Sequence, residues 1–239
     1  MRIISKLEHK LYSLYGLLQP TYLRFFPGVP VILRRELSGC ETLLDLGCGR
    51  HSFLLNSNIL SSMKLSVGVE LFEPYLIESK GEQIHSQYLQ ADVRRIEFKP
   101  RSFDAVVAIE LLEHLTKEEG IELIAKMENW ARKKVVITTP NEYLWQDAYD
   151  NNPYQMHKCG WSAEELRKLG FRVLGINGWR RLTGPLGLMR YQPAFLWTRI
   201  SDLTQKVTYY YPNLAFQLLA VKQIPTPIEK RITSMAHRL

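Results

Sequence analysis

The stretch Leu43–Leu55, LLDLGCGRHSFLL, decides the fold. Its apolar beginning is typical of a buried strand, and the loop Asp45–Gly49 (DLGCG) closes that strand. Glycines in such a loop let the backbone turn sharply and let a ligand approach without a Cβ atom in the way. Ligands bind open parallel sheets at the carboxyl ends of the strands, so we expect a binding site at this loop.

Short apolar runs and longer amphipathic stretches alternate around and after this loop. The runs are rich in β-branched residues and are bounded by glycine, proline or charge, which is typical of strands. The predicted strands are Thr42–Leu46, Leu65–Glu70, Gln87–Gln90, Phe103–Ile109, Val135–Thr138 and Phe171–Ile176, and the predicted helices are Pro74–Gln83, Lys117–Arg132 and Ser162–Leu169. The alternation predicts an α/β fold with a mostly parallel, doubly wound sheet that helices cover on both faces.

Residues 1–40 precede the alternating pattern and are expected to form an N-terminal helical cover on the main domain, residues 41–239. Three prolines interrupt this leading segment, and a helix cannot run through them undisturbed. We therefore expect a helix, a turn and a second helix near Val31–Leu37.

Composition and charge exclude several classes of protein. The 239 residues are 46% hydrophobic and 23% charged, as in a globular chain rather than a disordered one. Three cysteines without a CxxC pair predict neither a disulfide framework nor a zinc site and favour a reducing, cytoplasmic location. Apolar runs are too short for an integral membrane segment, and the charged N-terminus does not fit a signal peptide. The basic residues behind the net charge of +7 are scattered and form no nucleic-acid motif, so we expect no nucleic-acid partner.

Acidic residues follow three successive predicted strands. Asp45 precedes the glycine loop, Glu70 closes the second strand and Asp92 follows the third. Glu70 has the spacing at which nucleotide-binding sheets place a carboxylate on ribose hydroxyls, and Asp92 can accept a hydrogen bond from an adenine amino group. Three acids at three strand ends predict an adenosine-containing ligand.

The sequence resembles the class I methyltransferases that use S-adenosyl-L-methionine, over about residues 40–178, and it is most similar to the small-molecule group that includes the ubiquinone-biosynthesis O-methyltransferases. The matching runs are LLDLGCGRHSFLL (Leu43–Leu55), VGVE (Val67–Glu70), ADV (Ala91–Val93), FDAVVAIELLEHL (Phe103–Leu115) and VVITTPN (Val135–Asn141). The resemblance implies a seven-stranded Rossmann-like sheet whose last strand, Ala215–Val221, is antiparallel.

The resemblance also implies which residues hold the cofactor. The expected contacts are Asp45, Gly47 and Gly49 with the methionine part, Glu70 with the ribose, Leu71, Asp92 and Val93 with adenine, and Ile109 and Glu110 near the amino end. His51 stands where loops of this family often carry a third glycine. The alternative cofactor, a nicotinamide dinucleotide, requires G-x-G-x-x-G, and Ser52 stands at the position of its third glycine.

The run Glu110-Leu-Leu-Glu113-His114 is the first candidate for the chemistry. If a helix begins near residue 110, these three polar side chains lie on one helix face. His114 beside the carboxylates is then a candidate base, with Glu113 raising its pKa. The same set can bind a divalent cation, an option that the resemblance supports, or can simply pack and cap the next helix. We expect no metal.

His157 is the second candidate base, in the predicted acceptor region near residues 141–161. Its loop, NNPYQMHKCGW, follows the fifth strand, and loops at that sheet edge carry functional residues. The alternative is a loop held by local hydrogen bonds.

The sequence therefore predicts methyl transfer from S-adenosyl-L-methionine to a small molecule such as a phenol, a sugar or a lipid-linked compound, with oxygen favoured over nitrogen or carbon. The alternatives are a non-catalytic scaffold that binds the cofactor and an NAD-dependent oxidoreductase. Peripheral membrane contact is a further option, because Arg24 lies among exposed-type aromatic residues.

Overall fold

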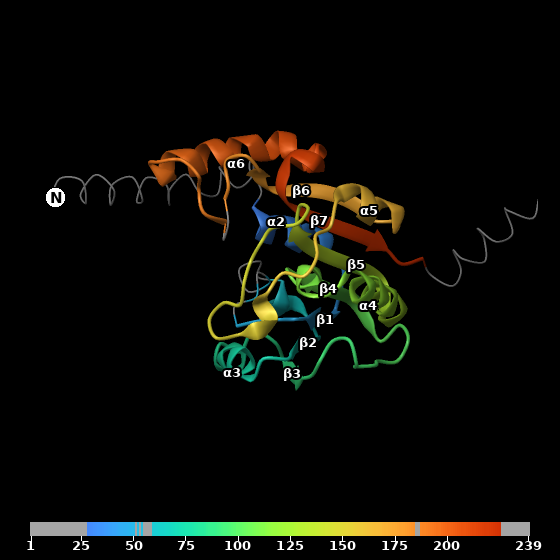
Figure 1. Cartoon of the computed structure of the whole chain (residues 1–239). Helices are drawn as coiled ribbons and strands as arrows, with labels where there is room; N and C mark the ends of the chain where they lie inside the picture. The colour runs from blue at the N-terminus through green and yellow to red at the C-terminus, as the bar shows by residue number, and fades with distance from the viewer. Residues whose placement is uncertain (1–27, 51, 53, 55–58, 185–186, 226–239) are drawn as a thin grey trace, which may run out of the picture.

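A computed structural model describes residues 28–50, 52, 54, 59–184 and 187–225, which form an α/β domain on a seven-stranded sheet (Figure 1). Most of the predicted N-terminal helical cover, residues 1–27, lies outside the described residues. The described part of that cover is α2 (Val29–Glu36), whose Pro30 lies in the first helical turn, where proline is tolerated.

The strand order is β3-β2-β1-β4-β5-β7-β6. The strands are β1 (Thr42–Leu46), β2 (Leu65–Glu70), β3 (Gln87–Gln90), β4 (Phe103–Ile109), β5 (Ala131–Pro140), β6 (Arg172–Trp179) and β7 (Ala215–Gln223). β1 to β5 pair in parallel, whereas β7 runs antiparallel to both β5 and β6. This topology is that of the Rossmann-like methyltransferase fold, and it confirms the predicted sheet with its antiparallel last strand.

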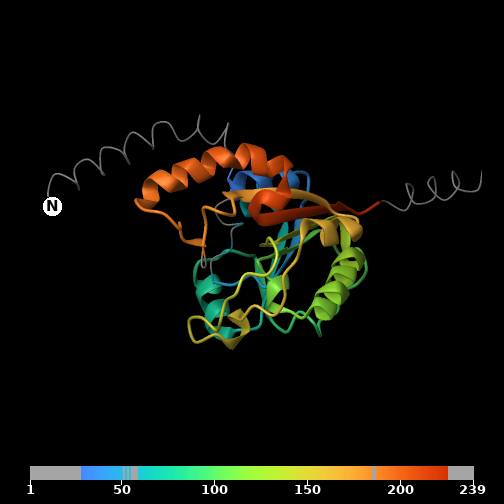
Figure 2. The ribbon, with the colours of Figure 1, turned by 45° about the horizontal axis from the view of Figure 1, so that its top comes forward.

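The sheet is buried on both faces. Successive side chains of β4 alternate between two hydrophobic clusters, with Val106 in one and Val107 in the other. Met127 of α4 (Lys117–Trp130) and Leu166 of α5 (Ala163–Lys168) pack in the first cluster, while Leu33 of α2 packs in the second. α3 (Glu73–Gly81) lies beside β2 and β3 at the other end of the sheet from α6 (Figures 1 and 2).

Capping boxes fix the beginnings of two helices. Thr116 and Glu119 exchange side-chain and backbone hydrogen bonds at the start of α4, and Ser162 and Glu165 do the same at the start of α5. The second box confirms the predicted start at Ser162. Four short 3-10 turns complete the described elements: η2 (Leu60–Ser62), η3 (Leu112–His114), η4 (Pro153–Gln155) and η6 (Pro212–Leu214).

The long helix α6 (Ala194–Tyr210) was not predicted. It buries Ser201, Gln205 and Thr208 against the domain, while Leu203 and Val207 are exposed. Predicting a helix from sequence relies on a stripe of apolar residues that face the core. In α6 the polar residues face the core and the apolar ones face outward. Among the described residues, no helix is both long enough and apolar enough to span a lipid bilayer.

Candidate functional site

The loop after β1 turns through two glycines with positive φ, 66° at Gly47 and 60° at Gly49. A Cβ atom at Gly47 would lie 2.7 Å from Cδ1 of Leu111, so glycine is required there for space as well as for conformation. The loop is anchored on the neighbouring strand, because the Cys48 N–H donates to the Val69 carbonyl at 3.0 Å. The predicted glycine turn is therefore present at the carboxyl edge of the sheet.

Asp45 is buried behind this loop with its two oxygens in different situations. Oδ2 accepts a hydrogen bond from Ser52 Oγ at 3.1 Å and lies 3.1 Å from Nε2 of His85. Oδ1 is buried and has no hydrogen-bond partner among the described residues. Because an unpaired buried carboxylate oxygen is costly, Oδ1 is the atom of Asp45 that is available to a ligand. No sequence pattern pointed to His85, which follows α3 and is distant from the glycine loop along the chain.

Glu70 holds the loop in place as well as facing the pocket. Its Oε2 accepts from the Gly49 N–H at 3.0 Å, and its Oε1 accepts from the Phe72 N–H at 2.8 Å. Burial raises the pKa of this carboxyl, and the backbone hydrogen bonds oppose that rise. Each oxygen keeps a lone pair with which to accept a further hydroxyl.

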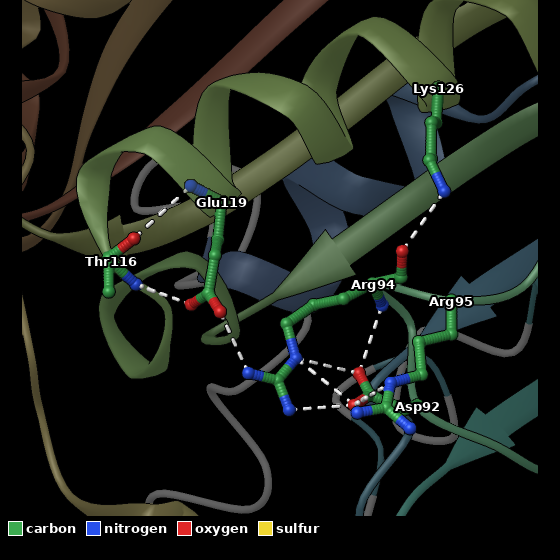
Figure 3. Close-up of polar contacts among 6 residues, drawn as sticks. All are labelled: Asp92, Arg94, Arg95, Thr116, Glu119 and Lys126. Atoms are coloured by element: carbon green, nitrogen blue, oxygen red, sulfur yellow. Dashed lines mark hydrogen bonds and ion pairs between the residues drawn. The ribbon is translucent and has the colours of Figure 1, made fainter.

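Asp92 lies in an ion-pair network that the sequence did not predict (Figure 3). Arg94 donates from Nε and Nη2 to the Asp92 carboxylate and from Nη1 to Glu119 of α4 at 2.8 Å. The hydrogen bonds from Arg94 lower the pKa of Asp92, so this carboxylate is charged at neutral pH. The network ties the end of β3 to the start of α4.

Glu110 does not begin a helix, so the expectation of one helix face for the E-x-x-E-H run is wrong. Its φ is +52°, and its N–H donates to the Thr138 carbonyl of β5 at 3.0 Å. The carboxylate accepts from Thr138 Oγ1 at 2.7 Å and from Gln217 Nε2 at 2.5 Å. Burial raises the Glu110 pKa to about 7. The turn that follows is the 3-10 helix η3, which carries Glu113 and His114 but not Glu110.

Glu113, His114 and His157 converge on one point instead. One ligand atom from each lies within 4.8 Å of the others, and the two imidazole centroids are 4.9 Å apart. His114 Nδ1 lies 3.2 Å from the Met156 carbonyl, and His157 Nδ1 lies 2.6 Å from the Leu144 carbonyl. A carbonyl can only accept, so each Nδ1 carries the proton and each Nε2 presents a lone pair.

In this cluster both histidines are neutral, and the carboxyl group of Glu113 lacks a hydrogen-bond partner on one oxygen within the part of the chain that the structure describes. Burial, followed by the neighbouring His157, lowers the His114 pKa to about 4, and burial also lowers the pKa of His157. Burial, followed by Glu110, raises the pKa of Glu113, whose Oε2 has no hydrogen-bond partner among the described residues. The expected rise in the His114 pKa is therefore wrong, because desolvation and the neighbouring His157 lower this pKa. Two imidazole lone pairs beside one carboxyl form a ligand set suited to a divalent cation.

Two cavities meet at this point. The smaller, of about 100 Å³, lies at the glycine loop, and the larger, of about 680 Å³, lies between α2, α6 and the loop after β5. Residues of both linings are Glu110, His114 and Gln155. A methyl donor in the smaller cavity and an acceptor in the larger one would thus face each other across these side chains.

Most of the predicted cofactor residues line the smaller cavity: Gly47, Gly49, Glu70, Leu71, Asp92, Val93 and Glu110. Asp45 lies beneath that lining, and Ile109 packs in the second hydrophobic cluster instead. Sequence reasoning missed Lys158 and Tyr154 on this cavity and all the α6 residues of the larger one. The only sequence signal for Lys158 and Tyr154 was that they belong to the predicted acceptor loop.

A family model described as "Methyltransferase domain" matches residues 44–139, which run from β1 into β5 and include the loops after β1, β2 and β3. Residues 44–139 therefore form a methyltransferase domain of the class I, S-adenosyl-L-methionine-dependent kind. Its cofactor is therefore S-adenosyl-L-methionine, in agreement with the acids at the strand ends. None of the curated proteins matches the chain in sequence.

Solved structures confirm the fold of this methyltransferase. It is similar to an S-adenosylmethionine-dependent methyltransferase from Archaeoglobus fulgidus, at 20% identity and a TM-score of 0.50, over 85% of this chain and 98% of the other. A putative enzyme of the same kind from Listeria monocytogenes matches at 14% identity and a TM-score of 0.51, over 82% and 98% of the two chains. An S-adenosylmethionine-dependent methyltransferase from Mesorhizobium loti matches at 14% identity and a TM-score of 0.50, over 83% of this chain and 99% of the other. At these identities the likeness concerns the fold.

Proposed function

We propose that the methyltransferase transfers its methyl group to an oxygen of a small molecule in the larger cavity, as the ubiquinone-biosynthesis O-methyltransferases that its sequence resembles do. The observation that carries this proposal is the Glu113–His114–His157 cluster, which lines the larger cavity where it meets the smaller one. An amine or a carbanion is already nucleophilic and needs no such group, whereas a hydroxyl must lose its proton.

The cofactor is proposed to lie in the smaller cavity. The free Oδ1 of Asp45 would accept from the methionine end, and Glu70 would accept from the ribose hydroxyls. Adenine would pack between Leu71 and Val93. Because Arg94 already holds both Asp92 oxygens, Asp92 would contribute a remaining lone pair to the adenine amino group rather than a free carboxylate.

Methyl transfer forms a carbon–oxygen bond and breaks the carbon–sulfur bond, whose electron pair stays on sulfur. The residues of this chain align the acceptor with the methyl carbon and exclude water. The acceptor proton must also leave, and the cluster lies where it would be released.

We further propose that the cluster holds a divalent cation, a role not favoured from the sequence. Three features of the cluster fit: the two Nε2 lone pairs, the buried Glu113 oxygen without a partner, and the backbone carbonyls that fix each imidazole through Nδ1. A bound cation would stabilise the acceptor oxygen as an anion. The rival role is that His157 itself takes the proton through Nε2.

The proposed activity is tested with a labelled methyl donor and a small-molecule extract, from which labelled products are isolated and identified. Label on oxygen supports the proposal, and label on nitrogen or carbon contradicts it. S-adenosylhomocysteine binding without any transfer would instead support the non-catalytic scaffold.

The cation is tested without the acceptor, by titrating Mn²⁺ and following free Mn²⁺ by electron paramagnetic resonance. Glu113→Gln and His157→Ala are expected to weaken Mn²⁺ binding by about 10- to 100-fold or more, as for loss of an essential metal-site partner. The matched control is Glu122→Gln on the exposed side of α4. If wild type binds no Mn²⁺ and its turnover ignores chelator, while His157→Ala loses about 10²–10⁴-fold in turnover, His157 is the base.

A further inference from the structure

Helix α6 is attached to the domain through its polar side. Gln205 donates from Nε2 to the Gly175 carbonyl at 2.9 Å and accepts at Oε1 from the Gly178 N–H at 2.9 Å. Thr204 Oγ1 accepts from the Trp179 N–H, also at 2.9 Å. A Cβ atom at Gly175 would lie 2.1 Å from a backbone oxygen of α6, so the helix rests directly on β6. Hydrogen bonds and close backbone contact, rather than an apolar stripe, fix α6 in place.

The opposite side of α6 is apolar and exposed, and we call it the outer face. It consists of Phe195, Leu196, Leu203, Val207 and Tyr210. Leu203 is 57% exposed and Tyr210 is 75% exposed. A surface helix of a globular protein normally turns its apolar side to the core. A group of exposed apolar side chains on one face of a helix marks a surface that binds something apolar.

Cations lie along the same side of the helix. Arg199 and Lys206 are spaced by four and three residues from Leu203, so all three share one helix face. The acid of this part of α6, Asp202, is 3.2 Å from Arg199 and lies toward the larger cavity. The whole chain has a net charge of +7. Pairing two copies through the outer faces would bring like charges together, whereas an anionic surface would attract them.

We propose that the outer face of α6 docks the methyltransferase on an anionic lipid surface. The helix lies in the plane of the interface, with Leu203 and Val207 among the acyl chains, Phe195 and Tyr210 at headgroup level, and the cations extended toward lipid phosphates. The other side of α6 lines the larger cavity through Thr198, Ser201, Asp202 and Gln205. Docking therefore places that cavity beside the lipid, and, resting on the proposed function, an amphiphilic acceptor enters it from the membrane.

The test is co-sedimentation of the full chain with vesicles, without cofactor or acceptor, so that its outcome does not depend on methyl transfer. Vesicles of phosphatidylcholine alone are compared with vesicles that also contain phosphatidylglycerol. Leu203→Glu/Val207→Glu changes the outer face. Ile77→Glu/Ile121→Glu makes the same charge change at two exposed isoleucines of α3 and α4. Retained binding of S-adenosylhomocysteine shows that each variant is folded.

Wild type and the α3/α4 variant are expected to bind the anionic vesicles, and the Leu203/Val207 variant to lose at least roughly 10-fold in affinity. Arg199→Gln/Lys206→Gln should lose roughly 5-fold for each charge removed, and only on anionic vesicles. Two results overturn the proposal: wild type that stays in solution, or a Leu203/Val207 variant that binds as wild type does. If wild type is a dimer and the Leu203/Val207 variant is a monomer, the outer face binds a second copy of the chain rather than lipid.

Leu203→Trp gives a second measurement on a chain with an intact outer face. Its additional fluorescence should shift to shorter wavelength on anionic vesicles and be quenched by brominated acyl chains. Sedimentation with vesicles but no quenching at this position would place the lipid contact elsewhere and reject α6 as the docking element.

Discussion

At the scale of single residues, the two oxygens of Asp45 have different surroundings, and this difference bears on the proposed contact of Asp45 with the cofactor. Oδ2 accepts a hydrogen bond from Ser52 and lies 3.1 Å from Nε2 of the buried His85, while Oδ1 is left without a partner among the described residues. Fixing one oxygen orients the other, so the carboxylate is pre-organised for the positively charged end of the cofactor. His85 is thus a positioning residue in this arrangement.

Removing either support should weaken cofactor binding without unfolding the domain. Ser52→Ala is expected to raise the dissociation constant of S-adenosylhomocysteine by about 5- to 10-fold, since a hydrogen bond contributes ~1 kcal/mol. His85→Leu is expected to raise it as well, because Oδ2 loses the imidazole nitrogen that lies 3.1 Å away. Asp45→Asn should cost more, because the charge is lost as well. Calorimetric titration measures all three variants, with Glu122→Gln as the control. Unchanged affinity in His85→Leu would mean that Ser52 alone orients the carboxylate.

The residue scale also shows where sequence reasoning succeeds and where it fails. Asp45 and Glu70 were predictable because parallel strands end at one edge of the sheet. Glu110 was misplaced because helical spacing was assumed, whereas a positive φ and a bond to Thr138 keep this residue beside β5. His157 was expected near the acceptor, but no sequence spacing could show that it meets His114, since a long loop brings it there.

At the scale of elements, the strands were easier to predict than the helices. β1, β2, β3 and β4 begin and end as predicted. The runs of β2 and β4 are rich in apolar and β-branched residues between turn residues, a pattern that is typical of strands. β5 begins at Ala131, four residues before the predicted start. The charged residues at its amino end were not expected in a strand, but this end still pairs with β4. α6 was missed because it packs through Gln205 and Thr204 and exposes leucine and valine.

The join between β3 and α4 provides a pH-dependent prediction. Arg94 lowers the pKa of Asp92, and the Thr116 backbone with Arg94 lowers the pKa of Glu119, from ordinary values of 3.8 and 4.5 (Figure 3). A carboxyl with a lowered folded-state pKa stabilises the fold above its unfolded-state pKa and loses that contribution as pH falls. Arg94→Met should therefore reduce the free energy of unfolding at pH 7 by about 1 kcal/mol, because the site is partly exposed.

The difference between wild type and Arg94→Met should shrink as the pH falls from 5 to 3, where both carboxyls become protonated. Urea denaturation at several pH values measures it, and Arg95→Met is the matched control, since Arg95 is 3.9 Å from Asp92 and 85% exposed. A difference that stays constant down to pH 3 would assign the effect to packing of the Arg94 side chain.

At the scale of the whole molecule, the proposed cofactor and acceptor sites lie in two adjoining cavities. The loops after β1, β2 and β3 line the smaller cavity, and α2, α6, β6 and β7 line the larger one. The segment after β4 and the loop after β5 contribute to both linings. The family match ends at residue 139, just before the loop at which we propose that the acceptor binds. The sequence therefore predicted best the part of the chain that is proposed to bind the cofactor. Residues that contact one fixed ligand follow a more regular pattern than residues that contact a variable acceptor. The acceptor half is built from a reversed helix and a long loop, for which general patterns are weaker.

This division predicts that the two cavities can be blocked independently. Thr198 lies on the exposed rim of the larger cavity, on the side of α6 that faces it. Thr198→Trp should fill part of that space and raise the KM for the acceptor, or abolish transfer to a bulky one, while the affinity for S-adenosylhomocysteine stays within about 2-fold, since distant sites act independently. Steady-state kinetics with the labelled acceptor and calorimetric titration of the product cofactor measure the two effects, with Ile121→Trp on α4 as the control. If Thr198→Trp leaves KM and turnover unchanged, the acceptor does not use the α6 side of the cavity. If it weakens cofactor binding instead, the two halves are coupled through α6, and the separation of tasks along the sheet is wrong.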